Sequence, residues 1–152
     1  MSLEKTEAAR LLTEIVLLTF RLEGGFLAAA DRISAPAGLT AARWKVLGAV
    51  LREKRSVAEI GRVMGLARQS VQRLADILVA EGLAAYEDNP AHKSAKLLAP
   101  TADGYARIAR LAHRQTGWAN RASEGIDPAR LAATRDMLAT LIARVEATEV
   151  PA

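Results

Sequence analysis

Residues Val57 to Leu83 read VAEIGRVMGLARQSVQRLADILVAEGL, a pattern that predicts two helices joined by a tight turn. Ser56 stands where the first helix needs an N-cap, and Glu59 follows three residues later, so the pair predicts a capping box. Gly65 interrupts the apolar stripe of the first helix, as the turn between two such helices often requires. The stretch therefore has the form of a helix-turn-helix.

The second helix of this stretch has one apolar side. After the turn, Val71, Leu74 and Leu78 recur at helical spacing, so we expect them to face inward. Gly82 predicts the end of the helix, and Leu83 can fold back onto it as a hydrophobic contact.

The opposite side of the second helix is polar. Its outward residues are Gln69, Gln72, Arg73 and Asp76, and the residues that flank its first turn are Arg68 and Ser70. Arginine pairs with guanine O6 and N7, glutamine pairs with adenine N6 and N7, and serine bonds either a base or a phosphate. An ordinary solvent-exposed helix would also carry arginine and glutamine, so the neighbouring segments must decide between the two interpretations.

Composition favours a mainly helical protein. The chain has 152 residues, of which 51% are hydrophobic and only 4% aromatic, and its abundant Ala, Leu, Arg and Glu are good helix formers. No apolar run is long enough to span a bilayer, and the charged N-terminus has no secretion signal, so we expect a cytoplasmic protein without a membrane partner. Cysteine is absent, which excludes disulfides, thiolate zinc sites and thiol-based redox sensing.

Positive charge is concentrated around the helix-turn-helix. Residues 40–75 hold eight basic and two acidic side chains, a net of +6, whereas the whole chain carries +4, so the remainder is −2. This distribution is typical of a nucleic-acid binder, although an acidic membrane or protein surface would also attract it.

A β-hairpin is expected directly after the second helix. Residues 84–88 and 95–99 can form two short strands, and the loop between them carries Lys93 and Lys96. A hairpin in this place is a wing, and its position favours DNA binding over a simple exposed helix.

Long helices are expected at both ends of the chain. The first runs from about Leu3 to Ile33, capped by Ser2 or Thr6, and a helix of about 30 residues would be about 45 Å long. That length exceeds a compact domain of this size, so part of it should pack on another subunit. Thr101 caps another long helix, and Asp127-Pro128 opens the last one.

A further helix is expected before the helix-turn-helix. It is capped by Thr40, carries Trp44, and extends through Val50 and Leu51.

These features together resemble the MarR family of winged-helix transcriptional regulators. The resemblance is carried by three segments: GLTAARWKVL (Gly38–Leu47), the helix-turn-helix (Ser56–Leu83) and the wing with the start of the next helix, NPAHKSAKLLAPTADG (Asn89–Gly104). It implies a mainly α fold with a small β-hairpin: a winged helix-turn-helix module over residues 37–100, flanked by long dimerisation helices over residues 1–36 and 101–152.

The resemblance also implies the function. We expect a homodimeric, sequence-specific regulator of transcription that acts as a repressor. Its recognition helices would enter major grooves of double-stranded DNA at an inverted-repeat operator. Where the wing of the family commonly carries a basic pair, this chain has Lys93 followed by Ser94. The residues predicted to contact DNA are Ser56, Arg62, Arg68, Gln69, Ser70, Gln72, Arg73, Lys93 and Lys96.

Members of the family often release DNA when a small aromatic ligand binds between the dimer helices and the winged module. The candidate lining residues are Phe20, Phe26, Trp44, His113 and Trp118, each of which could instead be an ordinary core or surface residue. No cofactor is expected, and no metal, because His92 and His113 lack paired ligand spacing.

Two other classes of function compete with this interpretation. An enzyme is not expected, because the chain has no G-x-S-x-G, P-loop or H-E-x-x-H motif and no cysteine nucleophile. A protein-binding winged-helix adaptor without specific DNA readout stays open as the alternative, although the basic cluster argues against it.

Overall fold

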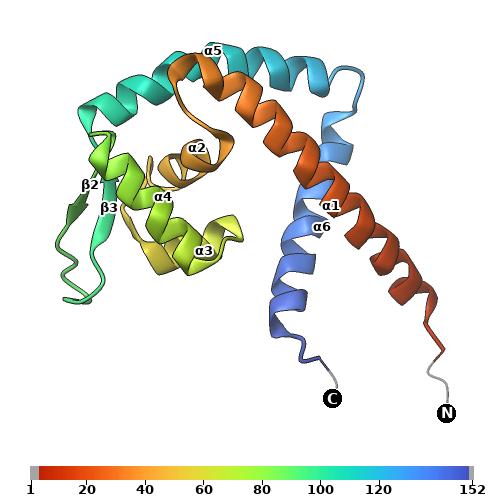
Figure 1. Cartoon of the computed structure of the whole chain (residues 1–152). Coiled ribbons are helices and arrows are strands. Elements are labelled where there is room, and N and C mark those ends of the chain that lie inside the picture. The colour runs from red at the N-terminus through yellow and green to blue at the C-terminus, as the bar shows by residue number, and fades with distance from the viewer. Residues whose placement is uncertain (1–3, 151–152) are drawn as a thin grey trace. The chain divides into compact units, whose positions relative to one another are not determined.

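Helices form most of the computed structural model, which describes residues 4–150 (Figure 1). In chain order the elements are α1 (Glu7–Ser34), the 3₁₀ turn η1 (Ala35–Ala37), α2 (Ala41–Gly48), β1 (Arg55–Ser56), α3 (Val57–Met64), α4 (Arg68–Ala80), β2 (Ala84–Glu87), β3 (Leu97–Pro100), α5 (Ala102–Ala122) and α6 (Pro128–Ala147). The predicted fold class, mainly α with a small β-hairpin, is confirmed.

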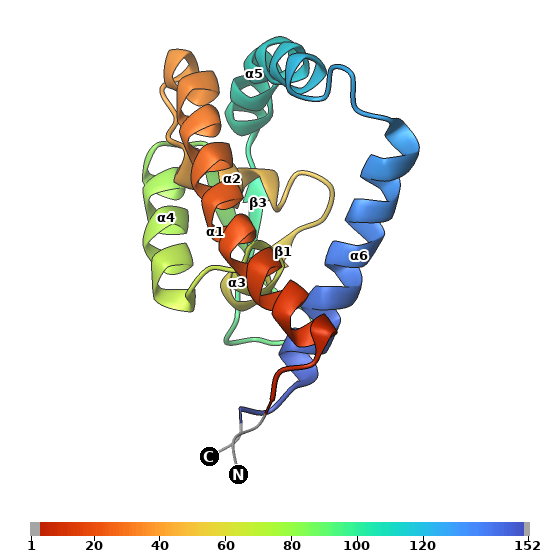
Figure 2. The same ribbon diagram turned by 90° about the vertical axis from the view of Figure 1, so that its right-hand side faces the viewer.

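Helix α1 starts at a side-chain cap and ends beside α2. The hydroxyl of Thr6 accepts a hydrogen bond from the Ala9 amide at 3.2 Å, so Thr6 is the cap, while Ser2 and Leu3 lie outside the described residues. At the other end, the Asp31 carboxylate accepts a hydrogen bond from the Ala41 amide at 2.6 Å and satisfies the first turn of α2. This bond ties the C-terminal part of α1 to the start of the winged module, and Figure 2 shows α1 passing α2 there.

Two local expectations were wrong. The second helix ends at Gly48 and does not continue through Leu51, and Arg55–Ser56 forms a short strand that was not predicted. This strand joins the hairpin to make a three-stranded antiparallel sheet in the order β1-β3-β2. Its register pairs Arg55 with Leu98, so the strand exists only because a segment 43 positions later in the chain supplies its partner.

The core lies between α2, α3, α4 and the sheet. Its fully buried side chains include Val46, Leu47, Ile60, Val71, Leu78 and Leu98. Val71, Leu74 and Leu78 are 0%, 6% and 0% exposed, which confirms the predicted inward face of α4.

The described chain divides into two compact units, with the boundary between Gln115 and Thr116 inside α5. The first unit contains α1, the winged module and the start of α5, and the second contains the rest of α5 and α6. The two compact units therefore differ from the predicted domains, a DNA-binding module over residues 37–100 and dimerisation helices over residues 1–36 and 101–152. That functional division stays a prediction. No helix among the described residues is long and apolar enough to cross a membrane.

Gly104 lies at a close approach between α5 and the end of α4. The Thr101 hydroxyl accepts a hydrogen bond from the Gly104 amide at 3.1 Å and donates one to the Gly82 carbonyl at 2.6 Å. A Cβ atom at position 104 would lie 2.0 Å from the Leu83 carbonyl oxygen, a distance that no packing tolerates.

We expect Gly104→Ala to lower the free energy of unfolding by about 1–3 kcal/mol, because the backbone must shift to admit the methyl group. Urea unfolding followed by circular dichroism measures the change. Gly48→Ala is the matched control, since a Cβ there meets nothing within 4 Å and alanine favours the helix. Equal stabilities of the two variants would contradict the packing described here.

Candidate nucleic-acid interface

The helix-turn-helix begins with the capping box at Ser56. Its hydroxyl accepts a hydrogen bond from the Glu59 amide at 3.3 Å, and the Glu59 carboxylate accepts bonds from the Ser56 amide at 2.7 Å and hydroxyl at 2.9 Å. The hydrogen bond from the Ser56 backbone amide is the largest cause that lowers the pKa of Glu59, and the bond from the Ser56 hydroxyl is the next. Ser56 is buried, and its hydroxyl holds α3 in place, so contact between this side chain and DNA stays a prediction.

The turn between α3 and α4 depends on Gly65. Its φ of 63° lies in the left-handed region, and its amide donates to the Gly61 carbonyl, which ends α3. Leu66 also donates to the Gly61 carbonyl, at 2.9 Å, so the chain reverses within a few residues before α4 begins at Arg68. A residue with a side chain at position 65 would be strained in this conformation.

The outer face of α4 is exposed as predicted. The side chains that were expected to read DNA from this helix are all exposed: Arg68, Gln69, Ser70, Gln72 and Arg73. Because the opposite face is buried in the core, the helix cannot rotate without exposing Val71 and Leu78.

Ion pairs divide the basic residues of positions 40–75 into two groups. Four of them pair with acids: Arg43 with Glu81, Lys45 with Glu23, Lys54 with Glu87, and Arg55 with Glu53. The remaining four form no ion pair with any residue of the described chain: Arg52, Arg62, Arg68 and Arg73.

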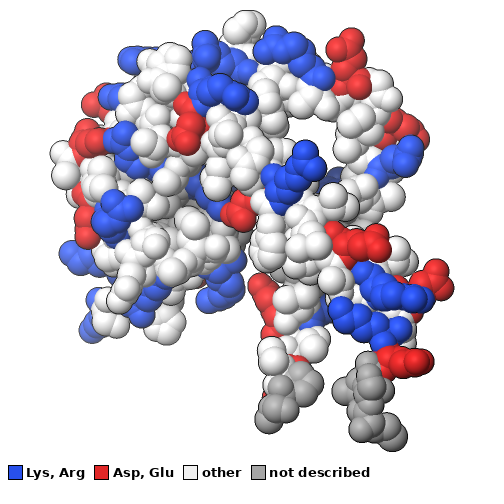
Figure 3. Space-filling view, turned by 45° about the vertical axis from the view of Figure 1, so that its right-hand side comes forward, with Lys and Arg blue, Asp and Glu red and all other residues white. Residues whose placement is uncertain are grey.

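Among the basic residues of positions 40–75, the unneutralised charge therefore lies mainly on the helix-turn-helix itself. Lys93 and Lys96 of the wing are also exposed and lack an ion pair within residues 4–150. Figure 3 shows Lys and Arg side chains along the lower left edge of the molecule, and further Lys and Arg side chains along its upper edge.

The wing is a short hairpin with an ordered loop. Asn89 holds the loop by donating to the Ala95 carbonyl at 2.9 Å and accepting from the Ala91 amide at 3.0 Å. Lys93 lies in this loop, between the two bonds. A cavity of about 280 Å³ separates the wing from α3 and α4, and both Arg68 and Lys96 line it. Helix α4 and the wing thus contribute basic side chains to one cavity.

Sequence reasoning missed one residue at this surface, Tyr86. Its hydroxyl donates to the Asp76 carboxylate at 2.6 Å and accepts from the Gln72 amide nitrogen at 2.9 Å, and that nitrogen also donates to Asp76 at 3.0 Å. Burial, followed by the hydrogen bond and charge of Asp76, raises the pKa of Tyr86 to about 12. Only the folded sheet brings Tyr86 to α4, so no local pattern could have identified it.

Comparison with known proteins agrees with this geometry. The sequence profile of the MarR family matches residues 37–93. An uncharacterised protein of Mycobacterium tuberculosis (strain H37Rv) is 36% identical over 141 residues, which is 93% of this chain and 96% of the relative. The chain belongs to the MarR family.

Solved MarR-type structures have the same fold. CouR from Rhodococcus jostii RHA1, bound to p-coumaroyl-CoA, has a TM-score of 0.75 and 26% identity, covering 90% of this chain and 95% of CouR. The M. tuberculosis transcriptional regulator MosR, solved in complex with DNA, has a TM-score of 0.72 and 21% identity, covering 89% and 98%. The chain thus has the winged-helix DNA-binding fold of a MarR-family transcriptional regulator.

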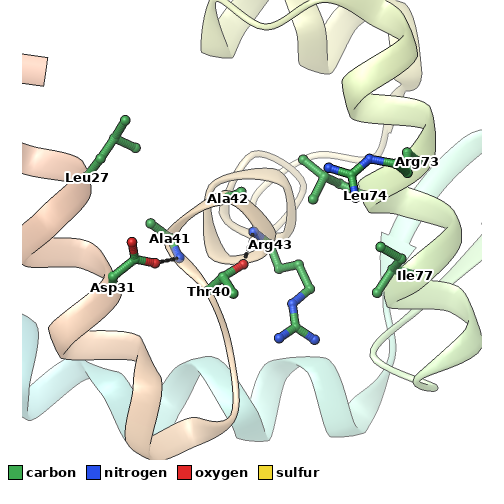
Figure 4. A pocket seen from close by; sticks show the side chains of 9 residues that line it. All are labelled: Leu27, Asp31, Thr40, Ala41, Ala42, Arg43, Arg73, Leu74 and Ile77. Atoms are coloured by element: carbon green, nitrogen blue, oxygen red, sulfur yellow. Dashed lines mark hydrogen bonds between the residues drawn. The ribbon is translucent and has the colours of Figure 1, made fainter. Parts of the chain in front are cut away.

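This MarR-family chain has a second cavity, between α1, α2 and α4 (Figure 4). It has a volume of about 530 Å³ and is lined by Leu27, Asp31, Thr40, Ala41, Ala42, Arg43, Arg73, Leu74 and Ile77. Figure 4 shows the Arg73 side chain extending from α4 towards α2. Arg73 also lines the shallow groove on the outer face of α4, so this one side chain borders both the cavity and the predicted DNA surface.

The predicted ligand residues do not line this cavity. Phe20 and Phe26 are 67% and 52% exposed on α1, and Trp44 is half-buried on α2. His113 is exposed and Trp118 is half-buried, both on α5. Their role in binding a ligand stays a prediction.

Proposed function

We propose that this MarR-family protein is a homodimeric, sequence-specific DNA-binding repressor that acts in the cytoplasm on an inverted-repeat operator. The observation that carries the proposal is the unpaired positive charge on the outer face of α4, next to an exposed row of base-reading side chains. Basic residues nearby are neutralised by acids, whereas those at the helix-turn-helix are left available for phosphates.

The contacts divide by chemistry. Gln69, Ser70, Gln72 and Arg73 would meet base edges or the nearest phosphates in the major groove. Arg62, Arg68, Lys93 and Lys96 would bind phosphates and groove edges, and Ser56 would act beside them through the cap of α3. MosR, which shares the fold, was solved in complex with DNA, and this supports the same use of the surface here.

The proposed dimer rests on apolar surface that a single chain leaves exposed. On α1, the exposed fractions are 65% for Leu17, 64% for Leu18 and 67% for Phe20. On α6, they are 56% for Met137, 59% for Ile142 and 62% for Val145. Exposed large apolar side chains on both terminal helices favour burial against a second copy. Two-fold symmetry would then place the recognition helices on half-sites about one helical turn apart.

We also propose that a small aromatic ligand regulates DNA binding. CouR, at 26% identity, was solved with p-coumaroyl-CoA bound. The cavity between α1, α2 and α4 of this chain has a volume suited to a small aromatic ligand. A ligand in that cavity would contact Arg73 and compete with DNA for it. The aromatic residues predicted on α1 and α2, which are Phe20, Phe26 and Trp44, offer an alternative site.

We expect Arg73→Ala to weaken operator binding by about 1–3 kcal/mol, because it removes a base-reading or phosphate-binding guanidinium from the outer face of α4. Fluorescence anisotropy with an operator selected from a random DNA pool measures the loss. Arg135→Ala is the control, since Arg135 pairs with its neighbour Asp136 on α6, outside the winged module. Unchanged affinity of Arg73→Ala would remove Arg73 from the interface.

The same titrations at several salt concentrations distinguish a DNA-binding protein from a protein-binding adaptor. Affinity for DNA should fall steeply as salt rises, because binding releases counterions from the phosphates. A chain that binds no DNA, and whose partner interactions are insensitive to salt, would be an adaptor.

We expect Leu18→Glu to shift the protein from dimer to monomer, since a carboxylate would be buried in an apolar interface without a partner. Sedimentation velocity measures the mass. Val63→Glu is the matched control, because Val63 is similarly exposed, at 54% against 64% for Leu18, but lies on α3. A dimer that survives Leu18→Glu would exclude this part of α1 from the interface.

We expect Ala42→Trp to abolish release of DNA by ligand, because the indole fills the cavity between α1, α2 and α4. The assay adds p-coumaroyl-CoA or benzoate to the labelled operator complex. Phe26→Ala is the comparison variant. Release that persists in Ala42→Trp but is lost in Phe26→Ala would place the ligand at Phe26 on α1.

A further inference from the structure

We infer that Tyr86 is a positioning residue that turns the middle of α4 into a hydrogen-bond-accepting surface, selective for bases with an amino group in the major groove. The inference rests on the proposed function, because it concerns how the DNA-reading surface distinguishes bases. Tyr86 lies on β2 and reaches the two outward side chains at the centre of α4, Gln72 and Asp76.

Gln72, Asp76 and Tyr86 form a triangle of hydrogen bonds. These bonds use every donor hydrogen of the three side chains. The two hydrogens of the Gln72 amide nitrogen go to the Asp76 carboxylate at 3.0 Å and to the Tyr86 hydroxyl at 2.9 Å. The single hydrogen of the Tyr86 hydroxyl goes to the same Asp76 oxygen at 2.6 Å. A carboxylate has no hydrogen to give, so no donor remains for DNA.

The groups that remain are acceptors. The amide oxygen of Gln72 and the second carboxylate oxygen of Asp76 form no hydrogen bond with a described residue. Both side chains are exposed and line the shallow groove along the outer face of α4, together with Gln69 and Arg73. A base edge that enters this groove therefore meets two acceptors at its centre.

The base preference follows from the pattern of the major groove. Adenine offers its N6 amino group and cytosine its N4 amino group, whereas guanine and thymine offer acceptors and the thymine methyl group. The usual two-bond pairing of glutamine with adenine also needs an amide donor for N7, and Gln72 has none to spare. Gln72 should accept one bond from adenine or cytosine and disfavour guanine.

The sheet keeps Tyr86 in a fixed position relative to α4. Its backbone pairs with Leu98 on β3, a fully buried residue at the centre of the sheet. The raised pKa of Tyr86 keeps its hydroxyl protonated at neutral pH, so it remains a donor to Asp76. The triangle is thus assembled before DNA arrives, and its orientation costs little on binding.

Selection of bound sequences from a random DNA pool tests the inference with four full-length proteins. The wild type should enrich adenine or cytosine at one position per half-site, and Gln72→Ala identifies that position by losing the preference there. Tyr86→Phe keeps the ring, frees the Gln72 donors, and should reduce discrimination at the same position on the order of fivefold or more. Affinity for scrambled DNA should change less than about twofold, because phosphate contacts are unaffected.

Tyr105→Phe is the matched control. It also removes one phenolic hydroxyl, but that hydroxyl donates to the Leu51 carbonyl at 3.3 Å and does not touch α4, so the wild-type motif should be retained. Asp76→Asn provides a second variant on an exposed helix position, where folding is not at risk, and should relax the same base position.

The outcomes separate this inference from the proposed function. Wild-type enrichment of guanine at the Gln72 position, or an unchanged motif in both Tyr86→Phe and Asp76→Asn, overturns the role of Tyr86 while leaving the DNA-binding function intact. A wild-type pool without any enriched motif overturns the proposed function, and this inference with it.

Discussion

Burial of one face of α4 fixes the direction of every side chain on the other face. Val71 and Leu78 are fully buried and Leu74 nearly so, which holds the helix in a single rotation against α2 and α3. Rotating the helix would cost the burial of at least two large apolar side chains, each contributing about 1.5–3 kcal/mol. The packing of the inward face therefore fixes the positions from which the outward polar side chains extend.

The distribution of positive charge around this helix depends on which basic residues form ion pairs as well as on how many there are. A count of basic residues over positions 40–75 gives a net of +6, but Arg43, Lys45, Lys54 and Arg55 each contact an acid. Surface ion pairs of this kind add little to stability. Their larger consequence is spatial, because they neutralise basic side chains near α2 and the sheet edge and leave Arg62, Arg68 and Arg73 of α3 and α4 unpaired within the described chain.

The sequence predicted what is local and missed what is not. The cap at Ser56, the turn at Gly65 and the inward face of α4 all follow from short-range patterns, and the structure confirms them. Strand β1 was missed because two residues have no periodicity and acquire strand geometry only by pairing with β3. Tyr86 was missed for the same reason, since its bonds to α4 cross from one element to another. The predicted DNA contacts share the exposed face but need a complex to test them.

Arg73 shows how such a surface could respond to a ligand without a large movement. It borders both the groove on the outer face of α4 and the cavity between α1, α2 and α4. One guanidinium cannot serve a ligand in the cavity and a phosphate or base in the groove with full strength in both. Any free energy that a ligand gains from Arg73 is then lost to DNA, and linkage requires DNA to weaken the ligand by the same factor. A loss of about 1.4 kcal/mol from this single contact would lower the affinity for DNA tenfold at each half-site. In the proposed symmetric dimer both half-sites would lose the contact, so one shared side chain in each subunit would be enough for the proposed regulation.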